Sequence, residues 1–203
     1  MKLIFVRHGK DDENYRGGWS NLDLIPEGIQ QAKLLADHLQ ENEKNYNIVK
    51  IIASDLPRTV TTAYYISSKL GIPLQKEPLL REINNGDLAG MLNETALIRY
   101  PGLFFNTLDM NEAYPNGESP IDFYLRIQTW FHGFCTDCRN INGNILVVTH
   151  SGVINIIYHL VNKIEWSNKG LMFKAANCGI HILNTESMVF EIQNKTDFLS
   201  EQL

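Results

Sequence analysis

The sequence predicts an α/β fold, a three-layer α/β/α sandwich with a mainly parallel central sheet. Three short apolar runs, at 3–6, 48–53 and 145–148, have the length and composition of buried strands. Segments with apolar residues at helical spacing lie between these runs. Strands that alternate with helices along a chain typically form one sheet with helices on both of its faces.

The first half of the chain contains two strand-then-helix units. The strand at 3–6 ends directly before Arg7-His8-Gly9, and a helix is expected from Pro26, because proline is favoured in a first turn. This helix carries apolar residues at helical spacing: Ile29, Ala32, Leu35, Ala36 and Leu39. The second strand covers 48–53. The next helix runs from about Pro57 to Leu70 and is ended by Gly71-Ile72-Pro73.

The second half is less regular at its start. Residues 79–90 are expected to form a loop because Asn and Gly interrupt them, and 92–116 are ambiguous, with some helix near 94–100. Ser119 can cap a long helix. The third strand, 145–148, precedes an apolar helix from Val153, and 178–184 and 188–193 alternate as two late strands. We expect one domain, 1–203, with a short lid-like insertion at about 85–118.

Charge and hydropathy narrow the classes of partner. Lysine plus arginine number 18 and aspartate plus glutamate 23, which gives a net charge of −5 with neutral histidines. Binding to nucleic acid or to an anionic membrane favours net positive charge. The apolar runs are far shorter than a membrane span, and 3–6 is too short for a signal peptide. We therefore expect no nucleic-acid or membrane partner. The odd number of cysteines fits a reducing cytoplasm, and no tail or helix indicates an oligomeric state, so a monomer and a homodimer both remain open.

The three cysteines predict no disulfide framework. Cys135 and Cys138 form a C-x-x-C inside an expected helix, and no second pair completes a zinc site. We interpret the pair as structural, with redox or metal chemistry as the alternative. No metal site and no cofactor are predicted.

Basic and protonatable side chains follow each of the three main strands. Arg7 and His8 follow the first strand, Arg58 follows the second at the start of a helix, and His150 follows the third. Loops at the carboxyl ends of parallel strands meet at one edge of the sheet, where helix N-termini also favour anions. We therefore predict that these side chains converge on a pocket for a phosphate-sized anion.

Such a pocket suits phosphoryl transfer. A neutral imidazole can attack phosphorus and form a phosphohistidine that water later cleaves. Arginines bind phosphoryl oxygens bidentately and stabilise the charge that spreads over them during transfer. Glu82, in the loop after the second unit, is the candidate acid for the leaving oxygen, because a bound phosphate would favour its protonated form.

Several motifs keep a fixed order over about residues 3–183. They are Val6-Arg7-His8-Gly9, Pro26-Glu27-Gly28, Ser54-Asp55-Leu56-Pro57-Arg58, Leu80-Arg81-Glu82, Gly117-Glu118-Ser119 and Val148-Thr149-His150-Ser151-Gly152. Together they resemble the histidine phosphatase superfamily, also called the phosphoglycerate mutase-like family. The resemblance implies that family's fold, with the insertion over the active site.

The resemblance also implies a role for individual residues. His8 matches the phosphorylated nucleophile and Glu82 the proton donor, while Arg7, Arg58 and His150 match the rest of the phosphate pocket. Substrate-binding roles are implied for a further three residues: Asn14, Arg16 and, through its main-chain N–H, Ser151.

Departures from the family pattern fall mostly on the rim of the implied pocket. Lys10-Asp11 replaces the usual Glu-Thr, and the stretch between Asn14 and Gly18 is about two residues short. Asn155 stands where an arginine is common. These changes bear on the identity of the substrate more than on the reaction.

The segment between Gly90 and Gly117 favours hydrolysis over phosphoryl transfer to a second hydroxyl. It has 26 residues and a single cation, Arg99, against three acidic residues. The glycolytic mutases of the resembled family carry a long insertion here, and a mutase needs an enclosed, cationic lid. We therefore predict a phosphomonoester hydrolase acting on a small-molecule phosphoester. One alternative is a phosphoglycerate-type mutase, because residues 84–90 keep the shape of the mutase-type segment. The other is a non-catalytic protein that binds a phosphorylated metabolite.

Overall fold

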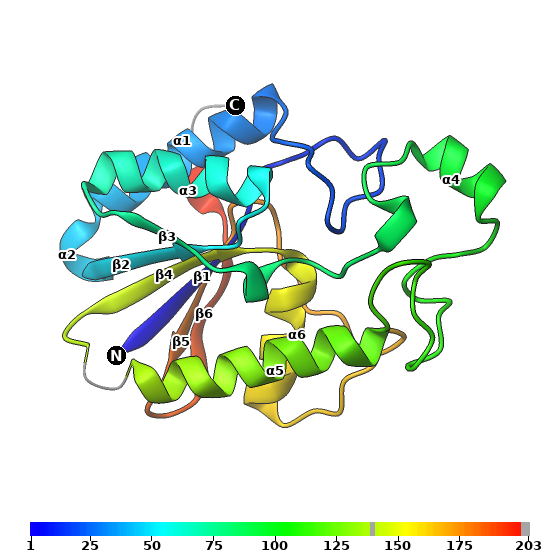
Figure 1. Ribbon diagram of the computed structural model, residues 1–203. Coiled ribbons are helices and arrows are strands. Elements are labelled where there is room, and N and C mark those ends of the chain that lie inside the picture. The colour runs from blue at the N-terminus through cyan, green and yellow to red at the C-terminus, as the bar shows by residue number, and fades with distance from the viewer. Residues whose placement is uncertain (139–140, 200–203) are drawn as a thin grey trace.

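The computed structural model describes residues 1–138 and 141–199. Its parallel strands are β1 (Lys2–Arg7), β2 (Ile48–Ala53), β3 (Leu74–Lys76) and β4 (Asn144–Thr149). Two further strands, β5 (Ile180–Asn184) and β6 (Val189–Lys195), are antiparallel, β5 to β1 and β6 to β5. Within the described residues the sheet order is β3-β2-β4-β1-β5-β6 (Figure 1). The predicted mainly parallel sheet is confirmed.

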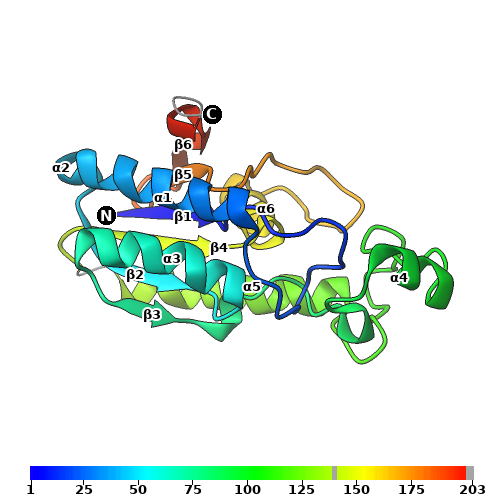
Figure 2. The same cartoon turned by 90° about the horizontal axis from the view of Figure 1, so that it is seen from above.

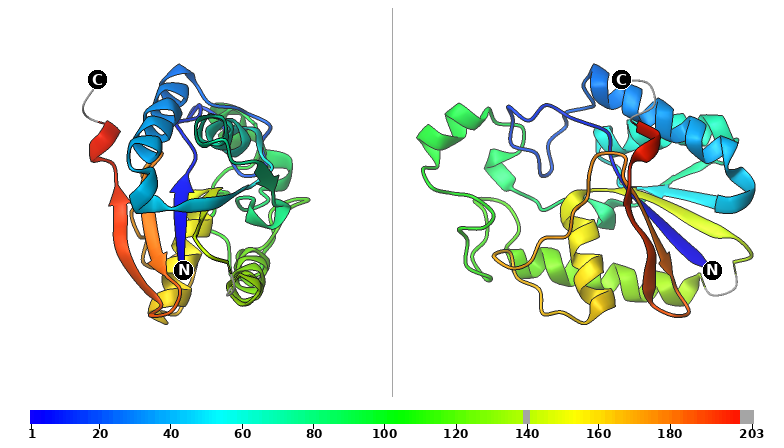
Figure 3. Two further views of the ribbon diagram at one scale, coloured as in Figure 1. Left: turned by 90° about the vertical axis from the view of Figure 1, so that its left-hand side faces the viewer. Right: turned by 180° about the vertical axis from the view of Figure 1, so that it is seen from behind.

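Helices cover both faces of this sheet, as a three-layer sandwich requires (Figures 2 and 3). α1 (Pro26–Glu41) and α3 (Pro57–Leu70) pack on one face, and α5 (Pro120–Asp137) and α6 (Ser151–Asn162) pack on the other. Alternate residues of β1 point to opposite faces, so Ile4 and Val6 join the core under α1 and α3, while Leu3 and Phe5 join the core under α5 and α6. The strand is therefore buried on both sides.

Local sequence explains where these elements begin and end. Proline occupies the first turn of α1, α3 and α5. Ser119 caps α5 by accepting a hydrogen bond from the Asp122 N–H at 3.2 Å, and Asp122 accepts one from the Ser119 N–H at 3.3 Å. Gly71 ends α3 with φ of 68°. The predicted bounds of β2 and α3 match those observed.

Several elements differ from the sequence expectation. β5 begins two residues after its predicted start, and β6 ends two residues after its predicted end. α6 begins at Ser151, two residues before the predicted Val153, with His150 as its N-cap. The short α2 (Glu43–Tyr46) and β3 were not predicted. No helix in the described ranges has the length and apolar character needed to cross a bilayer.

The segment at 85–118 extends beyond the end of the sheet where β1, β2 and β4 finish (Figures 1 and 2). It contains a short 3₁₀ turn, Gly86–Leu88, and α4 (Asn93–Arg99). Asn168 in the loop after α6 ties it down by donating to the Phe105 and Leu108 carbonyls at 2.6 and 2.9 Å. This segment is positioned next to the carboxyl ends of the parallel strands.

Candidate active site

The fold brings together the side chains that follow β1, β2 and β4. Arg7 ends β1 and His8 follows it, Arg58 lies in the first turn of α3, and His150 caps α6. The His8 and His150 rings are 5.2 Å apart between centroids, and Arg58 Nε lies 3.3 Å from His8 Nε2. The predicted convergence of these residues is therefore present in the structure.

The His8 imidazole is held as a neutral ring with a defined tautomer. Its Nδ1 lies 2.7 Å from the Gly9 carbonyl oxygen, which can only accept, so Nδ1 carries the hydrogen and Nε2 carries the lone pair. Burial lowers the pKa of His8 well below its usual value, and the positive charges of Arg58 and Arg7 lower it further. A neutral imidazole with a lone pair on Nε2 is a competent nucleophile.

The Arg58 guanidinium is almost fully buried and is fixed at several points. It donates to the Gly18 carbonyl at 2.7 Å and to the Ser20 carbonyl and hydroxyl at 3.4 and 3.3 Å. Asp11 Oδ2 lies 3.5 Å from its Nε. Burial lowers the pKa of Arg58, and the Asp11 charge opposes this shift. These protein contacts thus fix the orientation of the guanidinium.

Arg7 and His150 each retain a polar nitrogen with no partner among the described residues. Arg7 Nη1 donates to the Ala175 carbonyl at 3.0 Å, but Arg7 Nε has no partner there. His150 Nε2 lies 2.9 Å from Ser54 Oγ, and its Nδ1 has none. Burial, then the charge of Arg58, lowers the pKa of His150. Buried polar groups in proteins are nearly always hydrogen-bonded, so these nitrogens are suited to contact a ligand.

Glu82 reaches the site from the loop after β3. Its Oε2 accepts a hydrogen bond from the Gly152 N–H at the start of α6, at 3.0 Å. A Cβ atom at position 152 would lie 2.2 Å from Glu82 Oε1. Glycine at 152 therefore allows the carboxyl group to approach the helix end this closely.

A cavity of about 290 Å³ is common to most of these groups. The predicted site residues in its lining are Arg7, His8, Arg58, Glu82 and Ser151. His150 is not among the described lining residues, although its ring centroid lies 5.2 Å from that of His8. The lining also includes a run of three acidic residues: Asp11, Asp12 and Glu13. Sequence reasoning placed Asp11 near the rim as a departure from the family pattern but gave no role to Asp12 or Glu13, although the run directly follows Arg7-His8-Gly9-Lys10.

The two predicted rim residues lie outside that lining. Asn14 donates from Nδ2 to Asp12 Oδ1 at 2.9 Å and is exposed. The Arg16 guanidinium stacks over the Phe104 ring, 4.5 Å from its centroid. Their contact with substrate remains a prediction.

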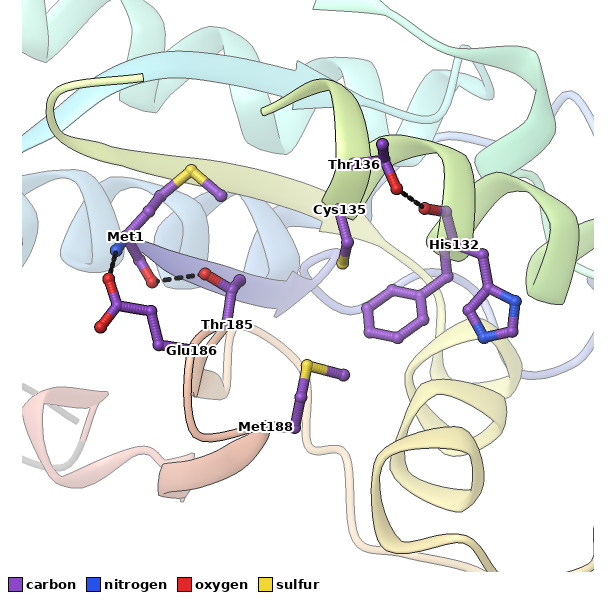
Figure 4. Close-up of a pocket in the computed structure, with 8 residues that line it drawn as sticks. Met1, His132, Cys135, Thr136, Thr185, Glu186 and Met188 are labelled. Atoms are coloured by element: carbon purple, nitrogen blue, oxygen red, sulfur yellow. Dashed lines mark hydrogen bonds and ion pairs between the residues drawn. The ribbon is translucent and has the colours of Figure 1, made fainter. Parts of the chain in front are cut away.

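A larger cavity, of about 560 Å³, lies near the N-terminus between α5 and the turn that joins β5 to β6 (Figure 4). Its described lining includes His132, Cys135 and Glu186 but no arginine or lysine. The Met1 ammonium group in its wall pairs with Glu186 at 3.7 Å. A phosphate dianion is bound best by guanidinium groups, so size alone does not mark the site.

Cys138, the second cysteine of the C-x-x-C that contains Cys135, is buried at the end of α5.

Comparison with known proteins agrees with the geometry. The profile of the histidine phosphatase superfamily (branch 1) matches residues 3–197. Phosphoserine phosphatase 1 of Hydrogenobacter thermophilus is 30% identical over 92% of this chain and 87% of its own. A 2,3-bisphosphoglycerate-dependent phosphoglycerate mutase of Xanthobacter autotrophicus is 24% identical over 98% of each chain. A structure titled as a putative α-ribazole-5′-P phosphatase of Escherichia coli superposes with a TM-score of 0.80 and 22% identity, covering 96% of both chains.

Proposed function

Because the chain belongs to the histidine phosphatase superfamily, we propose that it hydrolyses small phosphomonoesters through a phosphoryl group carried by His8. The observation that carries this proposal is the juxtaposition of a neutral, buried His8 with Arg58, Arg7 and Glu82 in one cavity. Nucleophile, cationic groups and acid then line one cavity. The arginines supply the charge that stabilises the transferring group.

In the first step His8 Nε2 attacks phosphorus. The Nε2–P bond forms as the bond between phosphorus and the ester oxygen breaks, and the protonated Glu82 carboxyl gives its proton to the departing oxygen. In the second step water attacks phosphorus and the Nε2–P bond breaks. The Glu82 carboxylate takes a proton from that water, and inorganic phosphate leaves.

The charges around the cavity support hydrolysis over the mutase reaction. Its described lining holds two arginines against four carboxyl groups, those of Asp11, Asp12, Glu13 and Glu82. A phosphoglycerate-type mutase must retain a substrate with several negative charges, and like charges close together are repulsive. We therefore propose that substrates whose alcohol part is neutral or carries an ammonium group are preferred over bisphosphates.

Phosphoserine is the first substrate to test, because the relative called phosphoserine phosphatase is 30% identical. The experiment measures phosphate release from a panel of phosphorylated metabolites and an aryl phosphate, with the wild-type protein and His8→Ala in parallel. Removing the nucleophile should lower turnover by about 1,000-fold or more. Lys69→Gln, which breaks only a surface ion pair with Asp37, is the matched control and should retain activity.

Each rival function gives a different result in the same panel. A mutase would transfer the phosphoryl group faster than it releases phosphate and would depend on a bisphosphate primer. A protein that only binds phosphorylated metabolites would release no phosphate, even from the aryl ester. Unchanged turnover by His8→Ala would refute the phosphohistidine mechanism.

A further inference from the structure

The chain around Glu82 is irregular, and its carbonyl groups are bonded by one side chain from another element. Arg126 of α5 donates to the Leu79 carbonyl at 2.6 Å and to the Arg81 carbonyl at 3.0 Å. Its other terminal nitrogen donates to the Glu82 carbonyl at 3.1 Å. A single guanidinium thus fixes three backbone positions at and before Glu82.

Glu118 fixes that guanidinium and also the chain beyond Glu82. Its two carboxylate oxygens accept from Arg126 Nε at 2.8 Å and Nη2 at 2.9 Å, in the paired geometry that is strongest for arginine. Glu118 Oε2 also accepts from the Asn84 N–H at 2.9 Å, and the Glu118 N–H donates to the Asn84 carbonyl at 2.8 Å. The pair is largely buried, with 13% and 18% of the side chains exposed.

A second side chain, from the loop after β1, donates to the Glu82 carbonyl as well. Trp19 Nε1 donates to the Glu82 carbonyl at 2.7 Å. The Trp19 ring lies under the Arg81 guanidinium, 4.6 Å from its centroid. The Glu82 main chain is therefore held between α5 and the loop after β1, and its side chain extends to Gly152 of α6.

We propose that Arg126 and Glu118 are positioning residues for the acid step, holding the Glu82 carboxyl group within reach of the leaving oxygen. This inference rests on the proposed function of Glu82. A general acid must lie within hydrogen-bond distance of the atom it protonates, and a misplacement of about 1 Å can lower a rate 100-fold. Neither residue touches the cavity, so their effect is exerted through Glu82.

The test compares two phosphate esters that differ in how much they need an acid. One is an alkyl phosphate that the wild-type protein hydrolyses, and the other is 2,4-dinitrophenyl phosphate, whose leaving group is stable without a proton. The quantity measured is kcat/KM, which reports phosphoryl transfer to His8. Arg126→Gln and Glu118→Gln should lose about 10- to 100-fold on the alkyl ester and less than about 3-fold on the dinitrophenyl ester.

Three further variants make the result specific. Glu82→Gln should show the same selective loss, and Lys69→Gln should show none. Arg126→Lys keeps the positive charge, and that charge contributes to the low pKa of His150. The lysine ammonium group lacks the planar, forked arrangement of donors that arginine has. It should again lose activity selectively on the alkyl ester. Restoration of full activity by lysine would mean that charge, not position, matters, and would overturn the inference.

The remaining outcomes separate the inference from the proposed function. Equal losses on both esters, or no loss on either, overturn the inference while leaving His8 and Glu82 in their roles. If Glu82→Gln itself shows no selectivity, both the role of Glu82 and this inference are wrong. Thermal unfolding of each variant identifies a misfolded protein, and the nearly isosteric Glu118→Gln carries the test if Arg126→Gln does not fold.

Discussion

At His8, one hydrogen bond decides which nitrogen can attack. The Gly9 carbonyl accepts a hydrogen bond from Nδ1–H. Burial and the charges of two nearby guanidinium groups lower the pKa of the ring, so Nε2 stays unprotonated. Arg58 Nε lies 3.3 Å from that nitrogen. An incoming phosphoryl group therefore meets an arginine and a lone pair at the same place.

This arrangement predicts the ionisation of His8 in solution. Because its pKa is lowered, the ring should stay neutral on acidification through about pH 6.5, with the hydrogen on Nδ1. The ¹⁵N chemical shifts of the imidazole, followed by NMR from about pH 8 downwards, report both charge and tautomer. The spectrum of His8→Gln assigns the signal. A titration midpoint near 6.5, or a hydrogen on Nε2, would contradict the geometry.

At this scale the sequence predicted which side chains converge on one cavity, but not the side chains that bond to the chain around Glu82. Arg7, His8 and Arg58 follow strands of one parallel sheet, so topology alone predicts that they meet. Arg126 lies in the middle of α5 and acts on backbone carbonyls, for which no motif exists. Glu118 was visible in Gly117-Glu118-Ser119, but that motif also marks the start of a helix, and Ser119 does cap α5.

Among the elements, α6 is the one whose first turn contacts the Glu82 carboxyl group. Its N-cap is His150, and the Gly152 N–H donates a hydrogen bond to the Glu82 carboxyl group. Helix N-termini carry a partial positive charge, which favours an anion at this end. The start of α6 therefore carries both His150 and the Gly152 N–H that bonds the Glu82 carboxyl group.

Gly152→Ala tests that contact with little disturbance of the helix. The added methyl group would lie 2.2 Å from Glu82 Oε1, so the carboxyl group must move, whereas alanine is a better helix former than glycine. We expect kcat/KM for an alkyl phosphate to fall about 10-fold and the melting temperature to change little. Steady-state kinetics and thermal unfolding measure the two effects. A variant with full activity on the alkyl ester would show that the close approach is dispensable.

The sequence predicted best those elements that have both a clear hydrophobic pattern and residues that mark their ends. β2 is a mostly apolar run, and α3 has clear ends, at Pro57 and Gly71. β3 was missed because its three residues, Leu74–Lys76, are mostly exposed and carry no alternation. The need for glycine in Pro26-Glu27-Gly28 is visible only in the structure. A Cβ atom at position 28 would lie 2.0 Å from the Lys10 carbonyl oxygen.

Across the whole molecule, burial of neutral histidines couples stability to pH. His8, His150 and His181 come from different parts of the chain, and burial lowers the pKa of each. For His181 the folded pKa falls to about 4. Its Nδ1 accepts from the Tyr158 hydroxyl at 2.8 Å and from the Asn194 N–H at 3.2 Å, so protonation there would break both bonds.

The sign of this coupling follows from which state binds the proton. Below about pH 6.5 the unfolded chain protonates His181 and the folded chain does not until about pH 4, so stability present above 6.5 is lost as the pH falls. His181 alone should lower the free energy of unfolding by about 2 kcal/mol between pH ~7 and pH ~5.

Urea unfolding at those two pH values, for wild type and His181→Asn, checks this expectation. Asparagine can present an oxygen acceptor near the position of Nδ1 but does not titrate in this range. The variant should therefore lose less stability on acidification than the wild type. Equal pH dependence in the two proteins would mean that His181 does not contribute.

The two borders of the sheet have a consequence for how the protein behaves when concentrated. One border, β3, is three residues long, and the other, β6, carries Glu191 and Lys195 and is kinked where Asn194 has φ of 52°. Short, charged or kinked borders are poor templates for a strand from another molecule. Fibrous self-association through the sheet is thereby discouraged, and any pairing of two copies is expected to use helix surfaces instead.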